Sequence, residues 1–235
     1  FKISQAYLKQ CLGDVFGKKC IEKINTNKAV ADLDLTLKKF VFGQDEAIEK
    51  IHNTLIRSQA NLKKRRGPLG VFLFLGASGT GKTFMAKKTQ KAIYGDEKII
   101  RLDMSEYADE TAVNKIFGAN AGYVGYNDGS NFLKEVEERP RSVILLDEVE
   151  KAHPQVLNSF LHIFDEGQAK TSKGKLVDFK ESIFIVTGNV GSRERQASKK
   201  RTMAFSDTST EGEFEVSKKE EAIKAIKGHF KPEFL

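Results

Sequence analysis

A run of eight residues has the composition and spacing of a phosphate-binding loop. It fits the pattern G-x-x-x-x-G-K-[ST] in full and consists of Gly76, Ala77, Ser78, Gly79, Thr80, Gly81, Lys82 and Thr83. Glycines at these positions let backbone N–H groups curl around the β- and γ-phosphates of a nucleotide, and the N-terminus of a following helix favours the anion. The Lys82 ammonium can reach the phosphate oxygens, and the Thr83 hydroxyl can ligate Mg²⁺. The run therefore predicts a site for a nucleotide phosphate and magnesium.

Two adjacent carboxylates supply the second half of such a site. Asp147 and Glu148 directly follow the apolar run Val143–Leu146. Adjacent charges at the end of a buried strand are costly unless a metal or a cation compensates them. We expect Asp147 to hold the magnesium through its water shell and Glu148 to polarise the attacking water. A strand that ends at a solvated turn is the simpler alternative.

A polar residue follows another apolar run. Ile183–Val186 leads into Thr187-Gly188-Asn189. Taken alone, an asparagine in this context is more typical of a turn. In this order along the chain, we expect Asn189 to lie beside the γ-phosphate and to position the attacking water.

These residues need a scaffold that brings several strand ends together. Short apolar runs predict strands at 71–75, 99–102, 143–146 and 183–186, and the stretches between them predict helices at 82–94, 109–118, 130–138 and 153–166. Buried strands that alternate with helices indicate an α/β domain, with a parallel sheet covered on both faces. An amphipathic helix is expected at 45–65, with Ile48, Ile51, Leu55 and Ile56 on its buried face. Residues 4–39 and 218–227 also have a helical pattern, and 192–217 is a polar, exposed insertion.

Composition excludes several classes of protein. The chain has 235 residues, 40% of them hydrophobic, and a net charge of +7. Its longest apolar runs are far shorter than the roughly 20 residues of a membrane-spanning helix, and Phe1–Ile3 leads into polar sequence without a signal-peptide pattern. Cys11 and Cys20 form neither a disulfide framework nor a metal-ligand cluster. We expect a cytoplasmic protein, or one of an organelle matrix. The basic run Lys63–Arg66 leaves nucleic-acid binding open.

Longer strings resemble the second ATPase module of the Clp family of AAA+ protein unfoldases. The similarity extends from about Leu37 to the last residue. It rests on V-F-G-Q-D-E-A-I at 41–48, R-L-D-M-S-E-Y at 101–107 and D-E-V-E-K-A-H-P at 147–154. These strings are far more specific than the phosphate-binding pattern alone.

The resemblance implies a P-loop NTPase fold that binds ATP with Mg²⁺. It assigns Val41 and Phe42 to the segment that cradles adenine, and it places Phe84 in the nucleotide site. In the family, a G-Y-V-G loop lines the axial pore of a hexamer and grips unfolded polypeptide, which here implies Tyr123 and Val124 as the gripping residues. Tyrosine suits this task because it offers a large amphipathic surface without sequence preference. The implied partners are unfolded or tagged proteins and further copies of the chain.

The chain also departs from the family pattern. Ala77-Ser78 stands where the family usually has proline in the loop, a change that backbone binding should tolerate. The sequence stops before the family's Asn-Arg pair, the fifth core strand and the helical lid, so we expect weak hydrolysis by this chain alone. The expected organisation is a helical extension over 1–39 and a large nucleotide-binding subdomain over 40–235.

The branch of the family depends on the insertion. A tripeptide at Met203, Ala204 and Phe205 resembles the docking motif for ClpP peptidase, with alanine where glycine is expected. This favours a ClpA/ClpC-like unfoldase over a ClpB-like disaggregase. A DNA-remodelling AAA+ motor and a nucleotide-gated binding module without turnover are the alternatives from other classes.

Overall fold

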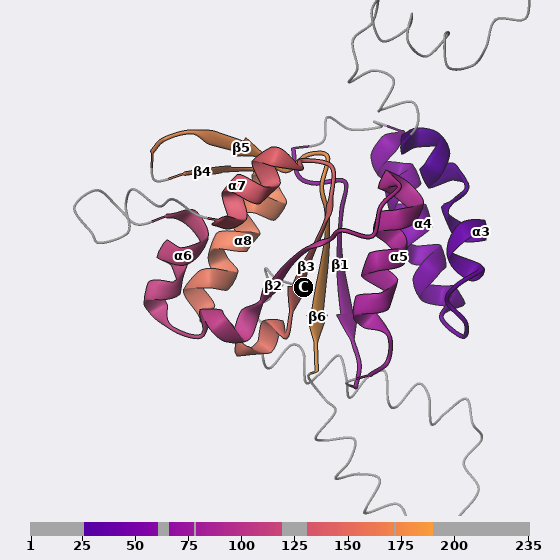
Figure 1. The fold of residues 1–235 in the computed structure, drawn as a ribbon, viewed down its shortest axis with the longest axis horizontal. Coiled ribbons are helices and arrows are strands. Elements are labelled where there is room, and N and C mark those ends of the chain that lie inside the picture. Colours follow the sequence, from indigo (N-terminus) through magenta and orange to yellow (C-terminus); the bar gives the residue numbers. More distant parts are fainter. Residues whose placement is uncertain (1–25, 61–65, 78, 119–130, 172, 190–235) are drawn as a thin grey trace, which may run out of the picture.

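A parallel sheet of four strands forms the centre of the molecule (Figure 1). The structure is a computed structural model that describes residues 26–60, 66–77, 79–118, 131–171 and 173–189. The strand order is β1-β6-β3-β2, and each neighbouring pair is parallel. The strands are β1 (Gly70–Leu75), β2 (Ile100–Asp103), β3 (Val143–Asp147) and β6 (Ile183–Gly188).

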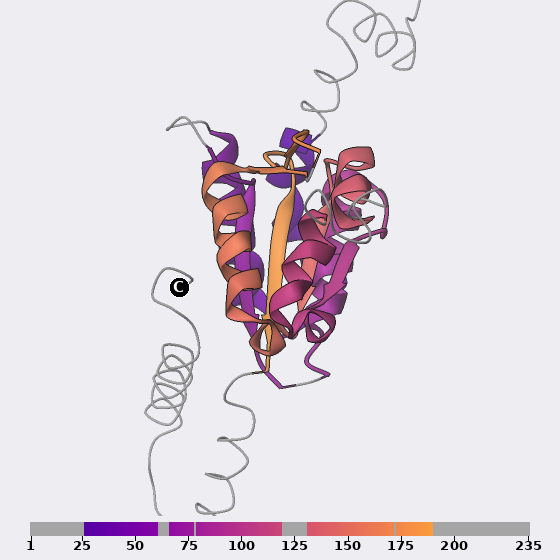
Figure 2. The same cartoon turned by 90° about the vertical axis from the view of Figure 1, so that its left-hand side faces the viewer.

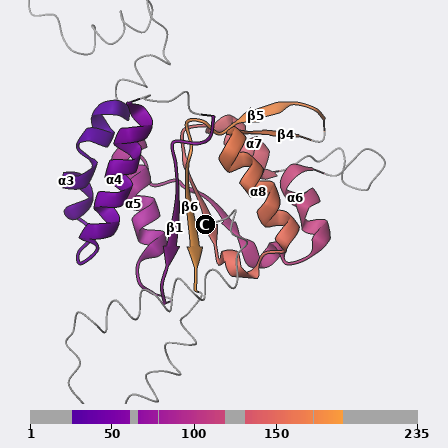
Figure 3. The same cartoon turned by 180° about the vertical axis from the view of Figure 1, so that it is seen from behind.

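Helices cover both faces of this sheet. One side carries α3 (Leu33–Lys38), α4 (Asp45–Gln59) and α5 (Lys82–Tyr94), and the other carries α6 (Val113–Phe117), α7 (Asn131–Glu138) and α8 (Pro154–Glu166). Figures 1 and 3 show the two layers from front and back, and Figure 2 looks onto the α6–α8 side. Short 3₁₀ turns lie at Met104–Tyr107, Glu110–Ala112 and Val149–Lys151. The α/β class with a parallel sheet between helices is confirmed.

The two layers of helices enclose two separate cores. Successive side chains along a strand point to opposite faces. In β3, Ile144 and Leu146 pack with α6, α7 and α8, whereas Val143 and Leu145 pack with α3, α4 and α5. Burial on both faces explains why β3 and β6 begin as continuous apolar runs in the sequence.

Phenylalanine rings fill much of the core on the α6–α8 side. Neighbouring ring centroids lie 5.0–6.4 Å apart, a spacing at which aromatic pairs attract one another. The rings belong to Phe132, Phe160, Phe164, Phe179 and Phe184, and therefore join α7, α8, β6 and the turn before β6.

A two-stranded hairpin that the sequence did not predict follows α8. Its strands β4 (Gln168–Lys170) and β5 (Leu176–Asp178) pair antiparallel, at the end of the sheet opposite the carboxyl ends of β1 and β6 (Figure 1). The chain passes very close to itself there. A Cβ on Gly67 would lie 2.2 Å from the Phe164 carbonyl oxygen, and one on Gly167 would lie 2.2 Å from the Arg66 oxygen.

The first helices differ in detail from their prediction. Residues 26–31 and α3 are helical, and Leu33 and Leu37 of α3 are buried in the core beside α4 and α5. α4 ends at Gln59, and residues 61–65 lie outside the described part. Ile56 was placed on the buried face, but 37% of it is exposed, because it follows Leu55 by one residue and so turns about 100° away.

No described helix is long and apolar enough to cross a membrane. The expected insertion at 192–217 and the helix at 218–227 also fall outside the described residues.

Candidate phosphate-binding site

The phosphate-binding loop starts where β1 ends and stops where α5 begins. The Gly76 N–H donates to the Gly188 carbonyl at 3.3 Å, so the loop begins beside the end of β6. Gly79 and Gly81 have φ angles of +80° and +87°, a backbone conformation that favours glycine. Gly81 then caps α5, which begins at Lys82. The sequence therefore builds a tight turn that delivers Lys82 to the carboxyl ends of the strands.

Strand alternation aims three polar side chains at the same side of the sheet. Leu145 of β3 faces α4 and α5, and two residues later Asp147 must face the same way. Because Ile100, Leu102 and Val186 face the opposite core, Arg101 of β2 and Thr187 of β6 also point toward the α5 side. Arg101, Asp147 and Thr187 thus meet on the side of the sheet where Lys82 begins α5.

The Lys82 ammonium is held by three oxygen acceptors. It donates to the carbonyl oxygens of Gly76 and Ala77 at 2.8 and 2.9 Å, and to Asn189 Oδ1 at 3.1 Å. Burial lowers the pKa of Lys82, and the nearby carboxylates of β3 and of the turn after it oppose that shift. Lys82 therefore lies where the expected phosphate site and the carboxylates meet.

Asp147 is held by two partners. The Thr187 hydroxyl donates to Oδ1, and Arg101 Nη2 contacts Oδ2 at 2.7 Å. The Asp147 side chain is only 14% exposed. Thr83 opens α5 after Lys82, so the site contains a hydroxyl and a carboxylate, the oxygen ligands that Mg²⁺ prefers.

This donor set fits a magnesium ion that is shared with phosphates and water. Among the described residues, no group of three or more His, Cys, Asp or Glu side chains is arranged to hold a metal without such help. Mg²⁺ typically binds in this shared way.

Glu148 has an unusual backbone and an engaged carboxylate. Its φ of +57° is the one positive value at a non-glycine residue in the described ranges. Lys151 Nζ lies 2.6 Å from Glu148 Oε2, and Asn189 Nδ2 donates to Oε1 over 3.4 Å. The Glu148 N–H donates to the Thr187 hydroxyl oxygen at 3.3 Å. The side chains of Glu148 and Asn189 are thus in contact.

A third acidic residue joins the site without having been predicted. Glu150 Oε1 accepts the backbone N–H of Asn189 at 3.1 Å, while its Oε2 is buried and has no hydrogen-bond partner among the residues that the structure describes. Lys151, Thr187 and Arg101 were likewise missed as partners. Only position could have indicated them, because each stands within two or three residues of a predicted site residue or of the matching strand end.

The residues assigned to adenine show mixed burial. Val41 is partly buried against the core that contains Met85 of α5, whereas Phe42 is 82% exposed. Phe84 is 46% exposed, and the Lys88 ammonium lies 5.0 Å from its ring centroid and 5.1 Å from that of Phe40. Lys88 thus links the Phe84 ring to that of Phe40, the residue before Val41, and the Phe42 ring is largely exposed.

Several predicted site residues lie outside the described part of the chain. They are Ser78 of the loop, Tyr123 and Val124 of the expected pore loop, and Met203, Ala204 and Phe205 of the expected docking motif.

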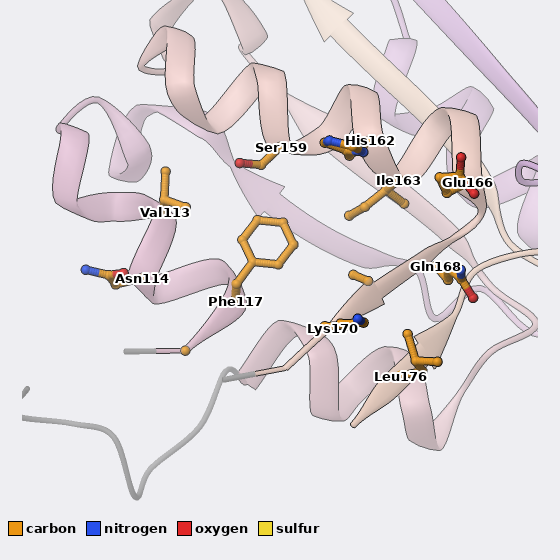
Figure 4. Close-up of a pocket in the computed structure, with 12 residues that line it drawn as sticks. Val113, Asn114, Phe117, Ser159, His162, Ile163, Glu166, Gln168, Lys170 and Leu176 are labelled. Atoms are coloured by element: carbon orange, nitrogen blue, oxygen red, sulfur yellow. The ribbon is translucent and has the colours of Figure 1, made fainter. Parts of the chain in front are cut away.

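A separate cavity of about 550 Å³ lies between α6, α8 and the β4–β5 hairpin. Figure 4 shows Phe117 of α6 facing Ser159, His162 and Ile163 of α8 across it. None of the described residues that were predicted to bind nucleotide lines this cavity. It is not part of the phosphate site.

A family model described as "AAA domain (Cdc48 subfamily)" matches residues 67–235. The chain is 42% identical over 204 residues to the chaperone protein ClpB of Enterococcus faecalis, covering 86% of this chain and 22% of ClpB. It is 40% identical over 218 residues to the Clp protease ATP-binding subunit ClpC of Staphylococcus epidermidis, covering 92% of this chain and 26% of ClpC.

A solved structure of Hsp104, described as a closed-state reconstruction with ATPγS and FITC-casein, superposes with a TM-score of 0.73. It is 37% identical, and the match covers 88% of this chain and 34% of the Hsp104 chain. The chain thus spans about a quarter of the length of the curated relatives it matches.

Proposed function

Because the chain belongs to the AAA domain family (Cdc48 subfamily), as a Clp/Hsp100-type AAA+ ATPase module, we propose that it binds ATP with Mg²⁺ and hydrolyses it. The observation that supports this proposal most directly is the pair of contacts made by the Asn189 side chain. This side chain contacts both the Lys82 ammonium and the Glu148 carboxylate. A residue in that position can sense the γ-phosphate and the attacking water together.

The roles of the other groups follow from their positions. The loop N–H groups and Lys82 would bind the β- and γ-phosphates, with α5 contributing its positive N-terminal end. Thr83 and Asp147 would hold Mg²⁺, which supplies charge stabilisation at the phosphates when bound. Glu148 would accept a proton from the attacking water, since each of its carboxylate oxygens has one printed partner and keeps a free lone pair.

A lysine variant tests the nucleotide site. Lys82→Ala removes a charged donor to the phosphates, so ADP and ATPγS should bind roughly 10- to 100-fold more weakly. Stabilisation by a ligand follows RT ln(1 + [L]/Kd), so the rise in melting temperature with nucleotide should shrink accordingly. Lys91→Ala is the matched control, because this half-exposed lysine lies on the same helix and pairs with Glu97. An unchanged nucleotide response in Lys82→Ala would refute the assignment of this loop.

At the level of the whole protein, we propose an unfoldase that threads polypeptide through a hexameric ring, with Tyr123 and Val124 as gripping residues. Support comes from the G-Y-V-G string and from relatives named as chaperones or Clp protease subunits. The Hsp104 structure, described as containing FITC-casein, is also consistent with a protein substrate.

Within the family, we favour a ClpA/ClpC-like unfoldase that feeds ClpP over a ClpB-like disaggregase. ClpB and ClpC relatives have nearly equal identity, so the proposal depends on the tripeptide Met203-Ala204-Phe205. Co-sedimentation of the full-length protein with ClpP in ATPγS tests it. Loss of binding in Phe205→Ala would support the docking role, and absence of binding by the unaltered protein would favour the disaggregase.

A further inference from the structure

Arg101 places a positive charge on the carboxylate that is expected to serve magnesium. We propose that Arg101 is a resident countercharge of Asp147 that sets how strongly nucleotide binding depends on Mg²⁺. This inference rests on the proposed function, because it concerns the same nucleotide site.

The contact follows from the register of the sheet. β2 pairs with β3 so that Asp103 lies opposite Asp147, and Arg101 lies two residues back along the same face. A long side chain reaches such a diagonal neighbour. The result is the 2.7 Å contact between Arg101 Nη2 and Asp147 Oδ2.

Thr187 shows that Asp147 does not need Arg101 for its orientation. Its hydroxyl donates to the other carboxylate oxygen, and Thr187 is completely buried on β6. The Arg101 side chain, in contrast, is 54% exposed and can leave toward solvent. A buried hydroxyl therefore fixes the carboxylate, while a half-exposed guanidinium balances its charge.

This division of roles gives Arg101 two effects of opposite sign on the two ligands. A guanidinium at Asp147 repels a divalent cation and lowers the attraction of the carboxylate for it. The same charge lowers the repulsion between Asp147 and a nucleotide that arrives without metal. Without Arg101, Mg²⁺ should bind more tightly and metal-free nucleotide more weakly, so both changes increase the metal dependence.

The alternative, a purely structural Arg101, predicts the opposite result. If Arg101 were needed to hold Asp147 in place, its removal would misplace the magnesium ligand. Nucleotide binding would then depend less on Mg²⁺. The sign of the change therefore separates the two roles.

The experiment measures the affinity of the chain for fluorescent ADP in excess Mg²⁺ and in EDTA. In Arg101→Met, the ratio of the dissociation constant in EDTA to that in Mg²⁺ should rise about three- to tenfold, as expected for removal of one partly exposed charge. Arg101→Lys keeps the charge and should leave the ratio within about twofold of the unaltered chain. Arg57→Met, at an exposed position on α4, is the matched control.

Two further measurements secure the interpretation. MgCl₂ without nucleotide should raise the melting temperature of Arg101→Met more than that of the unaltered chain. Asp147→Asn should remove the effect of Arg101→Met on the ratio, and Arg101→Gln repeats the test if the Met variant folds poorly.

The outcomes distinguish this inference from the proposed function. If the unaltered chain binds no nucleotide in either condition, the proposed function fails, and this inference fails with it. If the chain binds nucleotide but the ratio in Arg101→Met is unchanged or falls, the countercharge role alone is overturned. Persistence of the effect in the Asp147→Asn background would also overturn it.

Discussion

At the scale of single residues, most of the charged groups of the site are partnered by one another. A continuous path of contacts runs from Lys82 through Asn189 to Glu148 and on to Lys151. Buried or half-buried charges require such partners. Nucleotide binding must therefore exchange these contacts for contacts with phosphate and water, which costs part of the gross binding energy.

Glu148→Gln should separate nucleotide binding from hydrolysis. The amide keeps the shape of the side chain but cannot accept a proton, so ATP turnover should fall about 10²–10⁴-fold. Nucleotide affinity should stay within a few-fold, because Asp147 and Lys82 are untouched. Phosphate release and ADP binding by the full-length protein would measure the two effects. Turnover within about tenfold of the unaltered protein would show that Glu148 is not the base.

The sequence predicted the residues whose chemistry requires a fixed local spacing. Lys82 and Thr83 belong to a contiguous pattern, and Asp147 follows an apolar run that could be recognised locally. Arg101 and Lys151 could not be predicted as partners in this way. The Arg101 contact depends on strand register, which no local pattern encodes, and the Lys151 contact depends on the turn that follows Glu148.

At the scale of elements, long apolar runs were predictable and short polar strands were not. β3 and β6 are buried on both faces, so their sequences are continuously apolar. β4 and β5 have three residues each, and only the central residue of each is buried. Three-residue alternation in a polar segment cannot be told from a loop.

Gly67→Ala should destabilise the fold through a backbone clash. A Cβ there would lie 2.2 Å from the carbonyl oxygen of Phe164 in α8, so α8 and the segment before β1 would have to move apart. We expect a loss of about 1–3 kcal/mol in the free energy of unfolding, measured by urea denaturation. Gly174→Ala is the control, because the space there is open and only its φ of +79° opposes a side chain. A smaller loss in Gly67→Ala than in Gly174→Ala would contradict the close crossing.

At the scale of the whole molecule, the proposed work is done on another protein. Tyr123→Ala should leave ATP hydrolysis largely intact and abolish unfolding of a tagged reporter by the full-length ring, because this ring of residues would touch substrate and not nucleotide. Tyr126 ends the same string, G-Y-V-G-Y at 122–126, and Tyr126→Ala should reduce unfolding activity less than Tyr123→Ala. Full unfolding activity in Tyr123→Ala would exclude it as the grip.

DNA binding by the full-length protein distinguishes a protein motor from a DNA motor. DNA affinity measured at two salt concentrations should be weak and should show no steep salt dependence. Tight binding with a slope of several charges would instead favour the DNA-remodelling alternative, for which the net charge of +7 and the run Lys63–Arg66 are the sequence evidence.

The phosphate-binding loop directly follows β1, so a strand that pairs with β1 would also affect the loop. β1 is an edge strand of the described sheet, and Val71 on it is 40% exposed. The outward N–H and C=O groups of such an edge can accept one more strand. A strand added there would pair with the residues just before Gly76 and restrain the start of the loop. Strand pairing and nucleotide binding would then be thermodynamically linked. If one nucleotide state strengthens the pairing by a given free energy, the pairing strengthens the binding of that nucleotide by the same free energy.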